Sequence, residues 1–211
     1  LLGKQMELLQ ALKTVGKPMI VIYIQGRPLN MNWVHETAEA LLTAWYPGEE
    51  GGAAIADVLF GNYNPSGRLP ISIPRSVGQI PVYYNKSNPQ GHNYVELTAQ
   101  PLYSFGYGLS YTQYEYKDIL VTQHAPFDVE VSFTLKNCGE YDGEEVAQLY
   151  LRDEVASVVQ PVKQLKHFEK VFLKKGEEKQ INFRLNNDDF SIINMDIKRC
   201  VEPGDFTLMV G

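Results

Sequence analysis

The chain has 211 residues, of which 44% are hydrophobic and 21% are charged, a composition typical of folded globular domains. Its formal net charge of -6, without any run of Lys or Arg, argues against a surface that neutralises nucleic-acid phosphates. The longest apolar stretch, Met19 to Ile24, is too short to span a bilayer. We therefore expect one large or two medium domains, no nucleic-acid partner and no membrane span.

The first part of the chain alternates helical and strand patterns, which predicts an α/β fold. Apolar residues recur at helical spacing from Leu2 to Val15, until Gly16 ends the pattern. Met19 to Ile24 has no polar face, as expected of a parallel strand that is covered on both sides. Leu41 to Trp45 and Leu69 to Ile73 are predicted as two further strands. So few helices cannot cover such a sheet, so we expect part of a larger, mostly parallel domain.

The last part of the chain predicts an all-β domain. Pro74 to Tyr111 is rich in Pro, Gly, Asn and Tyr and shows no clear period, as in an ordered connecting segment. Apolar and polar residues then alternate in Asp128 to Lys136, in Ile181 to Leu185 and in Phe206 to Val210. About seven strands fit between Tyr116 and Val210, the number expected of a β-sandwich. Because the immunoglobulin Cys…Trp…Cys pattern is absent, a fibronectin type III-like sandwich fits better.

The stretch "WYPGEEGGAAIADVLFG", from Trp45 to Gly61, has the strand, glycine loop and helix order of a phosphate site. Glu49 and Glu50 stand at the helix start, where they complement the helix dipole and would repel a phosphate. Neither a P-loop nor a G-x-G-x-x-G spacing is present. We therefore expect the two carboxylates to cap the helix and the glycines Gly51 and Gly52 to permit close packing on the sheet.

The helix in this stretch carries Ile55, Val58 and Leu59 at helical spacing. This pattern predicts that the three side chains lie on one face and pack against the sheet. Upstream, Arg27 follows the carboxyl end of a predicted buried strand, where ligands of open α/β sheets gather. Arg27 is thus a candidate to line a site, and the alternative is that its guanidinium ties neighbouring loops together.

Residues that could hold a metal or react as nucleophiles are scattered. The four histidines are His35, His92, His124 and His167. None has a second ligand type at the close spacing of a metal site, so no metal or other cofactor is expected. No Ser or Cys nucleophile motif is visible. The two cysteines, Cys138 and Cys200, are too few to define a disulfide scaffold. The sequence is compatible with a disulfide bond between them and with two unpaired thiols.

The densest aromatic cluster is "PLYSFGYGLSYTQYEY", from Pro101 to Tyr116. Its aromatic residues are Tyr103, Phe105, Tyr107, Tyr111, Tyr114 and Tyr116. Aromatic faces can stack on sugars, and they can equally fill an interface while a polar tip stays in water. Because the cluster lies where the α/β pattern gives way to the β pattern, we favour packing between domains and keep sugar stacking as the alternative.

Four stretches together resemble the C-terminal part of family 3 glycoside hydrolases, the β-glucosidase and β-xylosidase family. They are "GKPMIVIYIQGRPL", "AWYPGEEGGAAIADVLFGNYNPSGRLPISIP", "PLYSFGYGLSYTQYEY" and "EEVAQLYLRDEVASVVQPVKQLKHFEKVFLKKGE". Their order matches, and the resemblance covers essentially the whole chain. Three departures are minor: Ser104 replaces a common Pro, Glu96 a usual Asp, and Cys138 a small hydroxyl residue.

The resemblance implies a barrel domain first, then an α/β sandwich and a fibronectin type III-like domain. It predicts the second half of the α/β sandwich at 1–92, an aromatic-rich linker at 93–113 and the β-sandwich at 114–211. Retaining enzymes of this kind use two carboxylates about 5 to 5.5 Å apart. By resemblance, the nucleophile is an Asp in the barrel domain and the acid/base is a Glu shortly upstream of Leu1. No catalytic, substrate-binding or metal residue is therefore assigned to this chain.

We expect a C-terminal fragment of a retaining, exo-acting β-glycosidase, most simply a β-glucosidase, with a structural role and no activity alone. Its acids have structural explanations, since Asp57 lies on a predicted helix and Glu144 and Glu145 begin a predicted strand. The resemblance implies a periplasmic or secreted parent and a β-linked substrate. The alternative is a non-catalytic carbohydrate-binding module. Against it, the sandwich strands alternate aliphatic and charged residues and show no exposed aromatic face.

Overall fold

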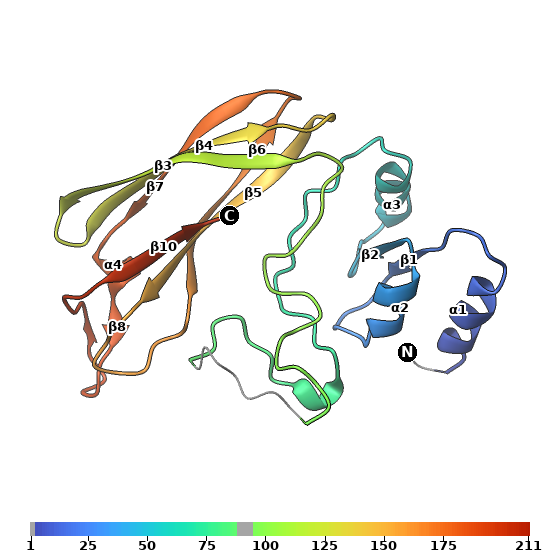
Figure 1. Cartoon of the computed structure of the whole chain (residues 1–211), viewed down its shortest axis with the longest axis horizontal. Helices are drawn as coiled ribbons and strands as arrows, with labels where there is room; N and C mark the ends of the chain where they lie inside the picture. Colours follow the sequence, from blue (N-terminus) through green and yellow to red (C-terminus); the bar gives the residue numbers. More distant parts are fainter. Residues whose placement is uncertain (1–2, 88–94) are drawn as a thin grey trace. The chain divides into compact units, whose positions relative to one another are not determined.

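The chain folds around two separate hydrophobic cores. The structure, a computed structural model, describes residues 3–87 and 95–211 (Figure 1). The N-terminal unit comprises Leu1–Asn62, Leu69–Tyr83 and His92–Tyr107. The sandwich unit comprises Tyr63–Arg68, Tyr84–Gly91 and Gly108–Gly211. No helix in the described ranges is both long enough and apolar enough to cross a membrane.

The N-terminal unit alternates short helices with strands, which confirms the α/β prediction. Its elements are α1 (Gln5–Lys13), β1 (Ile20–Tyr23), α2 (Asn32–Thr37), β2 (Ala40–Thr43), α3 (Gly51–Leu59) and the 3₁₀ turn η1 (Val77–Gln79). Strands β1 and β2 pair in parallel, from Ile20 opposite Ala40 to Tyr23 opposite Thr43. Helix α2 lies between them in the chain and supplies the crossover that parallel strands require.

The core of this unit lies on one face of β1. Val21 and Tyr23 contact the core, whereas Ile20 and Ile24 are more than half exposed. The buried core residues are Tyr23, Met31, Val34, Ile73 and Leu102. The apolar pattern of β1 predicts cover on both faces, and the described residues supply it on one.

One expectation for this unit is wrong, and one element was not predicted. Leu69 to Ile73 is not a strand of the parallel sheet, and Ile73 instead forms an isolated antiparallel bridge with Tyr103. Pro70 lies inside the stretch and has no N–H to donate to a strand ladder, which explains the failure. Helix α2 was not predicted, because six residues are too few to show a helical period.

The sandwich unit is built from antiparallel strands, which confirms the prediction of an all-β second part. Its elements are β3 (Tyr114–Ala125), β4 (Asp128–Asn137), β5 (Gly143–Asp153), β6 (Gln164–Leu173), β7 (Glu178–Leu185), α4 (Asn187–Phe190), β8 (Ile192–Ile193), β9 (Arg199–Cys200) and β10 (Phe206–Val210). One three-stranded sheet has the order β3-β4-β7 and the other has the order β10-β5-β6. Strands β8 and β9 form a separate short pair.

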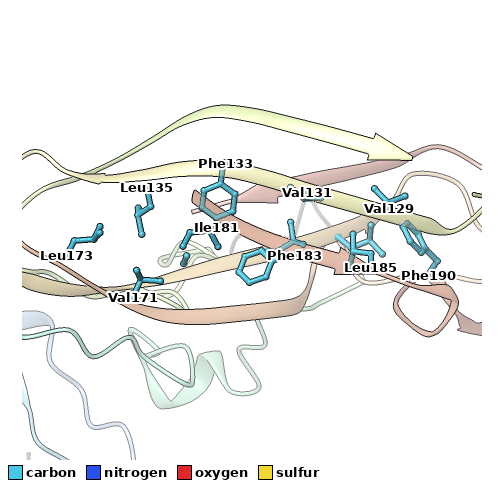
Figure 2. Packing of buried hydrophobic residues seen from close by; sticks show 13 residues of the cluster. Val129, Val131, Phe133, Leu135, Val171, Leu173, Ile181, Phe183, Leu185 and Phe190 are labelled. Atoms are coloured by element: carbon cyan, nitrogen blue, oxygen red, sulfur yellow. The ribbon is translucent and has the colours of Figure 1, made fainter. Parts of the chain in front are cut away.

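The two sheets enclose an apolar core (Figure 2). In β4, the alternate residues Val129, Val131, Phe133 and Leu135 are buried, as their spacing predicts. They lie beside matching residues of β7, with Val131 opposite Phe183 and Phe133 opposite Ile181. The second sheet contributes Ala147, Leu149, Leu151, Val171 and Leu173.

A fully buried amide side chain lies at the end of β4. The Asn137 Oδ1 atom accepts hydrogen bonds from Thr112 Oγ1 at 2.6 Å and from the Gly139 N–H at 3.2 Å. Its Nδ2 atom donates to the carbonyl oxygens of Tyr141 at 2.7 Å and Leu173 at 3.1 Å. Because Leu173 ends β6, this one side chain joins the first sheet to the second and satisfies its own polar atoms.

Replacing Phe133 with Ala should lower the free energy of unfolding of the sandwich unit by about 3–5 kcal/mol, because it leaves a cavity in the core. Thr134→Ala, at the adjacent and oppositely directed position of β4, should cost less than about 1 kcal/mol. Urea unfolding followed by far-ultraviolet circular dichroism measures both losses. Tryptophan fluorescence reports on the N-terminal unit, because Trp33 and Trp45 both lie there. Equal losses in the two variants would contradict the assigned faces of β4.

Candidate functional site

A cluster of hydrogen-bonded polar side chains in the sandwich unit joins segment 63–68 to the start of β5. We call segment 63–68 the anchor segment. Asn64 Oδ1 accepts hydrogen bonds from Ser110 Oγ and from the Tyr111 N–H, both at 2.8 Å. Asn64 Nδ2 donates to the Asp142 carbonyl at 3.0 Å. One amide side chain thus links three positions that lie 46 to 78 residues away in the sequence.

A buried ion pair completes this attachment. Arg68 Nη2 donates to Glu145 Oε2 at 2.5 Å, and the two side chains are only 12% and 8% exposed. Two charges taken out of water at this depth stabilise the fold only if they remain paired. Burial raises the pKa of Tyr116, and the nearby Glu145 carboxylate raises it further, so this tyrosine stays neutral at physiological pH.

The neighbouring carboxylate, Glu144, collects three donors. Lys170 Nζ lies 2.7 Å from its Oε2 atom, Tyr63 donates to the same oxygen at 2.7 Å, and Ser66 donates at 3.2 Å. The hydrogen bonds from Lys170 and Tyr63 hold the pKa of Glu144 below its ordinary value. A carboxylate with a lowered pKa in the folded state stabilises the fold at neutral pH and loses that effect as the pH falls through its folded-state pKa.

The backbone also approaches closely at the anchor segment. A Cβ atom on Gly108 would lie 2.2 Å from the Gly67 carbonyl oxygen, and one on Gly143 would lie 2.5 Å from Asn64 Nδ2. Only glycine fits at these two positions without a shift of the backbone or of Asn64. This cluster was not predicted, although the aperiodic Asn-Pro-Ser-Gly-Arg run at 64–68 is a signal for a structured loop.

The glycine loop before α3 only partly matches its prediction. Glu50 is the N-cap residue of α3, but neither its side chain nor that of Glu49 makes a capping hydrogen bond. The backbone of Glu50 has φ -84° and ψ 10°, a nearly helical conformation instead of the extended one that an N-cap side chain needs. The prediction of side-chain capping is therefore wrong. The two residues still place negative charge at the start of α3, where it complements the helix dipole.

Only one of the two glycines is a close-packing position. A Cβ atom on Gly51 would lie 2.6 Å from Pro47 Cγ, whereas one on Gly52 would meet nothing within 4 Å. Successive residues of a helix point about 100° apart, so both glycines cannot face the same neighbour. On the same helix, Ile55 and Val58 are half-buried and Leu59 is exposed. Gly51 is thus a close-packing position, but against a proline of the loop and not against the sheet, and the predicted close packing is wrong for Gly52.

Arg27 is exposed, and the structure gives it no hydrogen bond or ion pair within the described ranges. Both the loop-tying and the site-lining interpretation of Arg27 therefore stay predictions. Asp57, expected as a structural acid, accepts a hydrogen bond from Asn62 Nδ2 at 3.2 Å.

The histidines occupy separate places in the fold. His35 Nδ1 lies 2.7 Å from the Tyr103 hydroxyl, His124 pairs with Glu130 at 3.0 Å, and His167 lies 3.4 Å from Asp189. His92 lies outside the described residues. Among residues 3–87 and 95–211, no group of three His, Cys, Asp or Glu side chains fits a metal ion. Cys138 is exposed and Cys200 half-buried, and both are free thiols, which settles the question of a bridge.

The aromatic cluster is divided between the two units. Tyr103 stacks on Tyr107 with ring centroids 5.1 Å apart, inside the N-terminal unit, and burial raises the pKa of Tyr103. Phe105 belongs to the same unit. Tyr111, Tyr114 and Tyr116 belong to the sandwich unit, and the last two pack against its core. Packing between domains and sugar stacking both stay predictions for this cluster.

One sequence argument about the sandwich surface is wrong. Strand β6 exposes two aromatic rings at alternate positions, Phe168 at 67% and Phe172 at 47%, with exposed Lys170 between them. The prediction that the sandwich strands alternate aliphatic and charged residues, without an exposed aromatic face, is therefore wrong for β6. Its residues His167 and Val171 turn inward instead, since His167 stacks on the core residue Phe183 and Val171 is buried.

Comparison with known families agrees with this architecture. The family model described as the glycosyl hydrolase family 3 C-terminal domain matches residues 1–111, more than half of the chain. The chain belongs to glycosyl hydrolase family 3. A second model, of a fibronectin type III-like domain, matches residues 145–211 of this family 3 chain. The resemblance drawn from the four sequence stretches is thereby confirmed.

Relatives of this family 3 chain are considerably longer. A periplasmic beta-glucosidase of Salmonella typhimurium is 44% identical over 221 residues, which cover 98% of this chain and 29% of that protein. A beta-xylosidase of Formosa agariphila is 42% identical and is covered to 30%. The crystal structure of a beta-glucosidase from Listeria innocua in complex with isofagomine matches with a TM-score of 0.92 at 39% identity, covering 97% of this chain and 31% of that one. The chain thus spans less than a third of each of these proteins.

Gly51→Ala should destabilise the N-terminal unit by about 1–3 kcal/mol, because the added methyl group collides with Pro47. Gly52→Ala is the matched control. It should leave stability unchanged or raise it by about 0.5–1 kcal/mol, because Ala is the better helix former and its Cβ meets open space. Urea unfolding followed by the fluorescence of Trp33 and Trp45 distinguishes the two. A loss at Gly52 that matched the loss at Gly51 would refute the assignment.

Arg68→Met should destabilise the sandwich unit by about 3–5 kcal/mol, because it leaves the Glu145 carboxylate buried without its cation. Adding Glu145→Gln, which removes the stranded charge, should recover a substantial part of that loss. Arg184→Met, which breaks the more exposed pair with Asp128, should cost less than about 1 kcal/mol. Circular dichroism in urea measures all three variants. Equal losses for Arg68→Met and Arg184→Met would show that the anchor ion pair has no special role.

Proposed function

We propose that this chain is the C-terminal part of a retaining, exo-acting β-glucosidase that removes terminal β-linked sugars. The observation that carries the proposal is the structural match to the Listeria innocua beta-glucosidase. It covers 97% of this chain and 31% of that protein, with a TM-score of 0.92. In this proposal, the catalytic carboxylates and the barrel domain lie in polypeptide outside these 211 residues.

The role of the chain in such an enzyme is to support a catalytic domain. Two acids at the start of β5 are already engaged, since Glu144 is paired with Lys170 and Glu145 with Arg68. Ion-paired carboxylates of this kind are poor candidates for a general acid, which needs a raised pKa. We keep the division into 1–92, 93–113 and 114–211 as a proposal, supported by the family models that match 1–111 and 145–211.

We also propose that the whole enzyme works in the periplasm or after secretion. The support is the name of the Salmonella typhimurium relative, a periplasmic beta-glucosidase.

The proposed function is tested with a chimera. The 211 residues replace the matching C-terminal part of the Salmonella typhimurium relative, with which they share 44% identity. We expect the chimera to hydrolyse an aryl β-glucoside, and both the relative without this part and the 211-residue chain alone to be inactive.

Two results would contradict the proposal. One is a chimera that is soluble and folded but inactive. The other is turnover by the 211-residue chain itself that disappears when one of its own acids, such as Asp57, is changed to Ala.

A further inference from the structure

The sandwich unit contains a pocket with a volume of ≈ 330 Å³ where β5 ends. Its walls are the last residues of β5, the loop 155–162 that leads to β6, and Ser87. The polar side chains that line it are those of Ser87, Arg152, Asp153, Glu154 and Gln160, and valines of the loop supply apolar surface. Its volume is at the lower end of the range of roughly 300–1,000 Å³ for small-molecule sites.

Hydrogen bonds hold the walls of the pocket in place. The carboxylate of Glu202 accepts from the Ser157 N–H at 2.8 Å and from Ser157 Oγ at 2.5 Å, which fixes the middle of the loop. The Val162 N–H donates to the Lys86 carbonyl at 2.9 Å, which places Ser87 beside the loop. The Glu154 N–H donates to the Asp205 carbonyl at 3.1 Å. The pocket is therefore formed before any ligand enters it.

One polar atom in the pocket has no partner. Asp153 Oδ1 is buried and makes no hydrogen bond, while the adjacent Glu154 is engaged by Arg152 Nε at 3.2 Å and Thr207 Oγ1 at 2.5 Å. Burial raises the pKa of Asp153, and the charges of Glu202 and Glu154 raise it further. Buried acceptors are nearly always satisfied, so a hydroxyl or amine donor is needed at this position.

The charges around the pocket select the class of ligand. Asp153, Glu154 and the nearby Glu202 would repel a phosphate or sulfate. The described residues offer no group of three side chains that fits a metal ion. A neutral molecule with several hydroxyl groups can instead donate to Asp153 and accept from Arg152 and Gln160. The valines suit the C–H faces of a sugar ring.

We propose that this pocket binds one neutral sugar residue, whose hydroxyl group donates a hydrogen bond to Asp153 Oδ1. The inference goes beyond the proposed function, because the support of a catalytic domain requires no ligand site in the sandwich unit. It also differs from stacking on Phe168 and Phe172, because those rings do not line the pocket.

The test is a nuclear magnetic resonance titration of the ¹⁵N-labelled 211-residue chain with methyl β-glucopyranoside and methyl β-xylopyranoside at millimolar concentrations. We expect amide shifts at Ser87 and across 152–162. Asp153→Ala should weaken binding by about tenfold or more, because it removes a charged acceptor. Asp196→Ala, in an exposed turn of the same unit, should bind as tightly as the unaltered chain. Asp153→Ala should remain folded, because the buried Oδ1 atom has no partner and the carboxylate otherwise loses one backbone hydrogen bond from Val155.

Four results would overturn the proposal: no shifts with either sugar, shifts only around Phe168 and Phe172, unchanged binding by Asp153→Ala, or shifts at the pocket with calcium chloride or inorganic phosphate in place of the sugars. The chimera assay remains a separate test. If the chimera is active but the titration shows no amide shifts with either sugar, the pocket proposal is refuted and the proposed function still holds.

Discussion

The ion pair between Arg68 and Glu145 is the electrostatic constraint around which the anchor segment of the sandwich unit is arranged. Its two side chains are almost fully shielded from water, so each charge needs the other. The glycines at 108 and 143 let the anchor segment approach closely enough for the pair to form. Asn64 and Glu144 make further hydrogen bonds around it, to the Asp142 carbonyl and from the Tyr63 hydroxyl. Charge, close backbone approach and amide hydrogen bonds thus act together at one edge of the sandwich.

The two units differ in how completely the described residues cover their apolar surfaces. The sandwich encloses Phe133 and its neighbours between two sheets and joins those sheets through Asn137 (Figure 2). The N-terminal unit instead leaves Ile20 of its first strand and Ile24, the residue after that strand, exposed. A parallel pair of strands needs cover on both faces, which agrees with a role as one part of a longer family 3 enzyme.

The hydrophobic periodicity of the sequence correctly predicted features that depend on neighbouring residues in the chain, such as the buried face of a strand. The alternation in β4 gave the buried face correctly, because side-chain direction along a strand has a period of two. Leu69 to Ile73 misled because its apolar residues are interrupted by Pro70, which cannot pair in a ladder. The anchor contacts could not be predicted, since Tyr63 and Arg68 meet partners 81 and 77 residues away in the chain. Likewise, composition did not reveal that Gly51, and not Gly52, meets Pro47.

The anchor segment also affects which stretch of the gene must be transferred for the β-sandwich to fold in another protein. It precedes the first strand, β3, by more than 40 residues, with part of the N-terminal unit between them. A genetic recombination event that moved only the strands would carry away Glu145 without Arg68 and leave an unpaired charge in the interior. A stretch that keeps this ion pair must therefore be longer than the strands of the sandwich. Selection should keep the Asn-Pro-Ser-Gly-Arg stretch and the strands together as one heritable block.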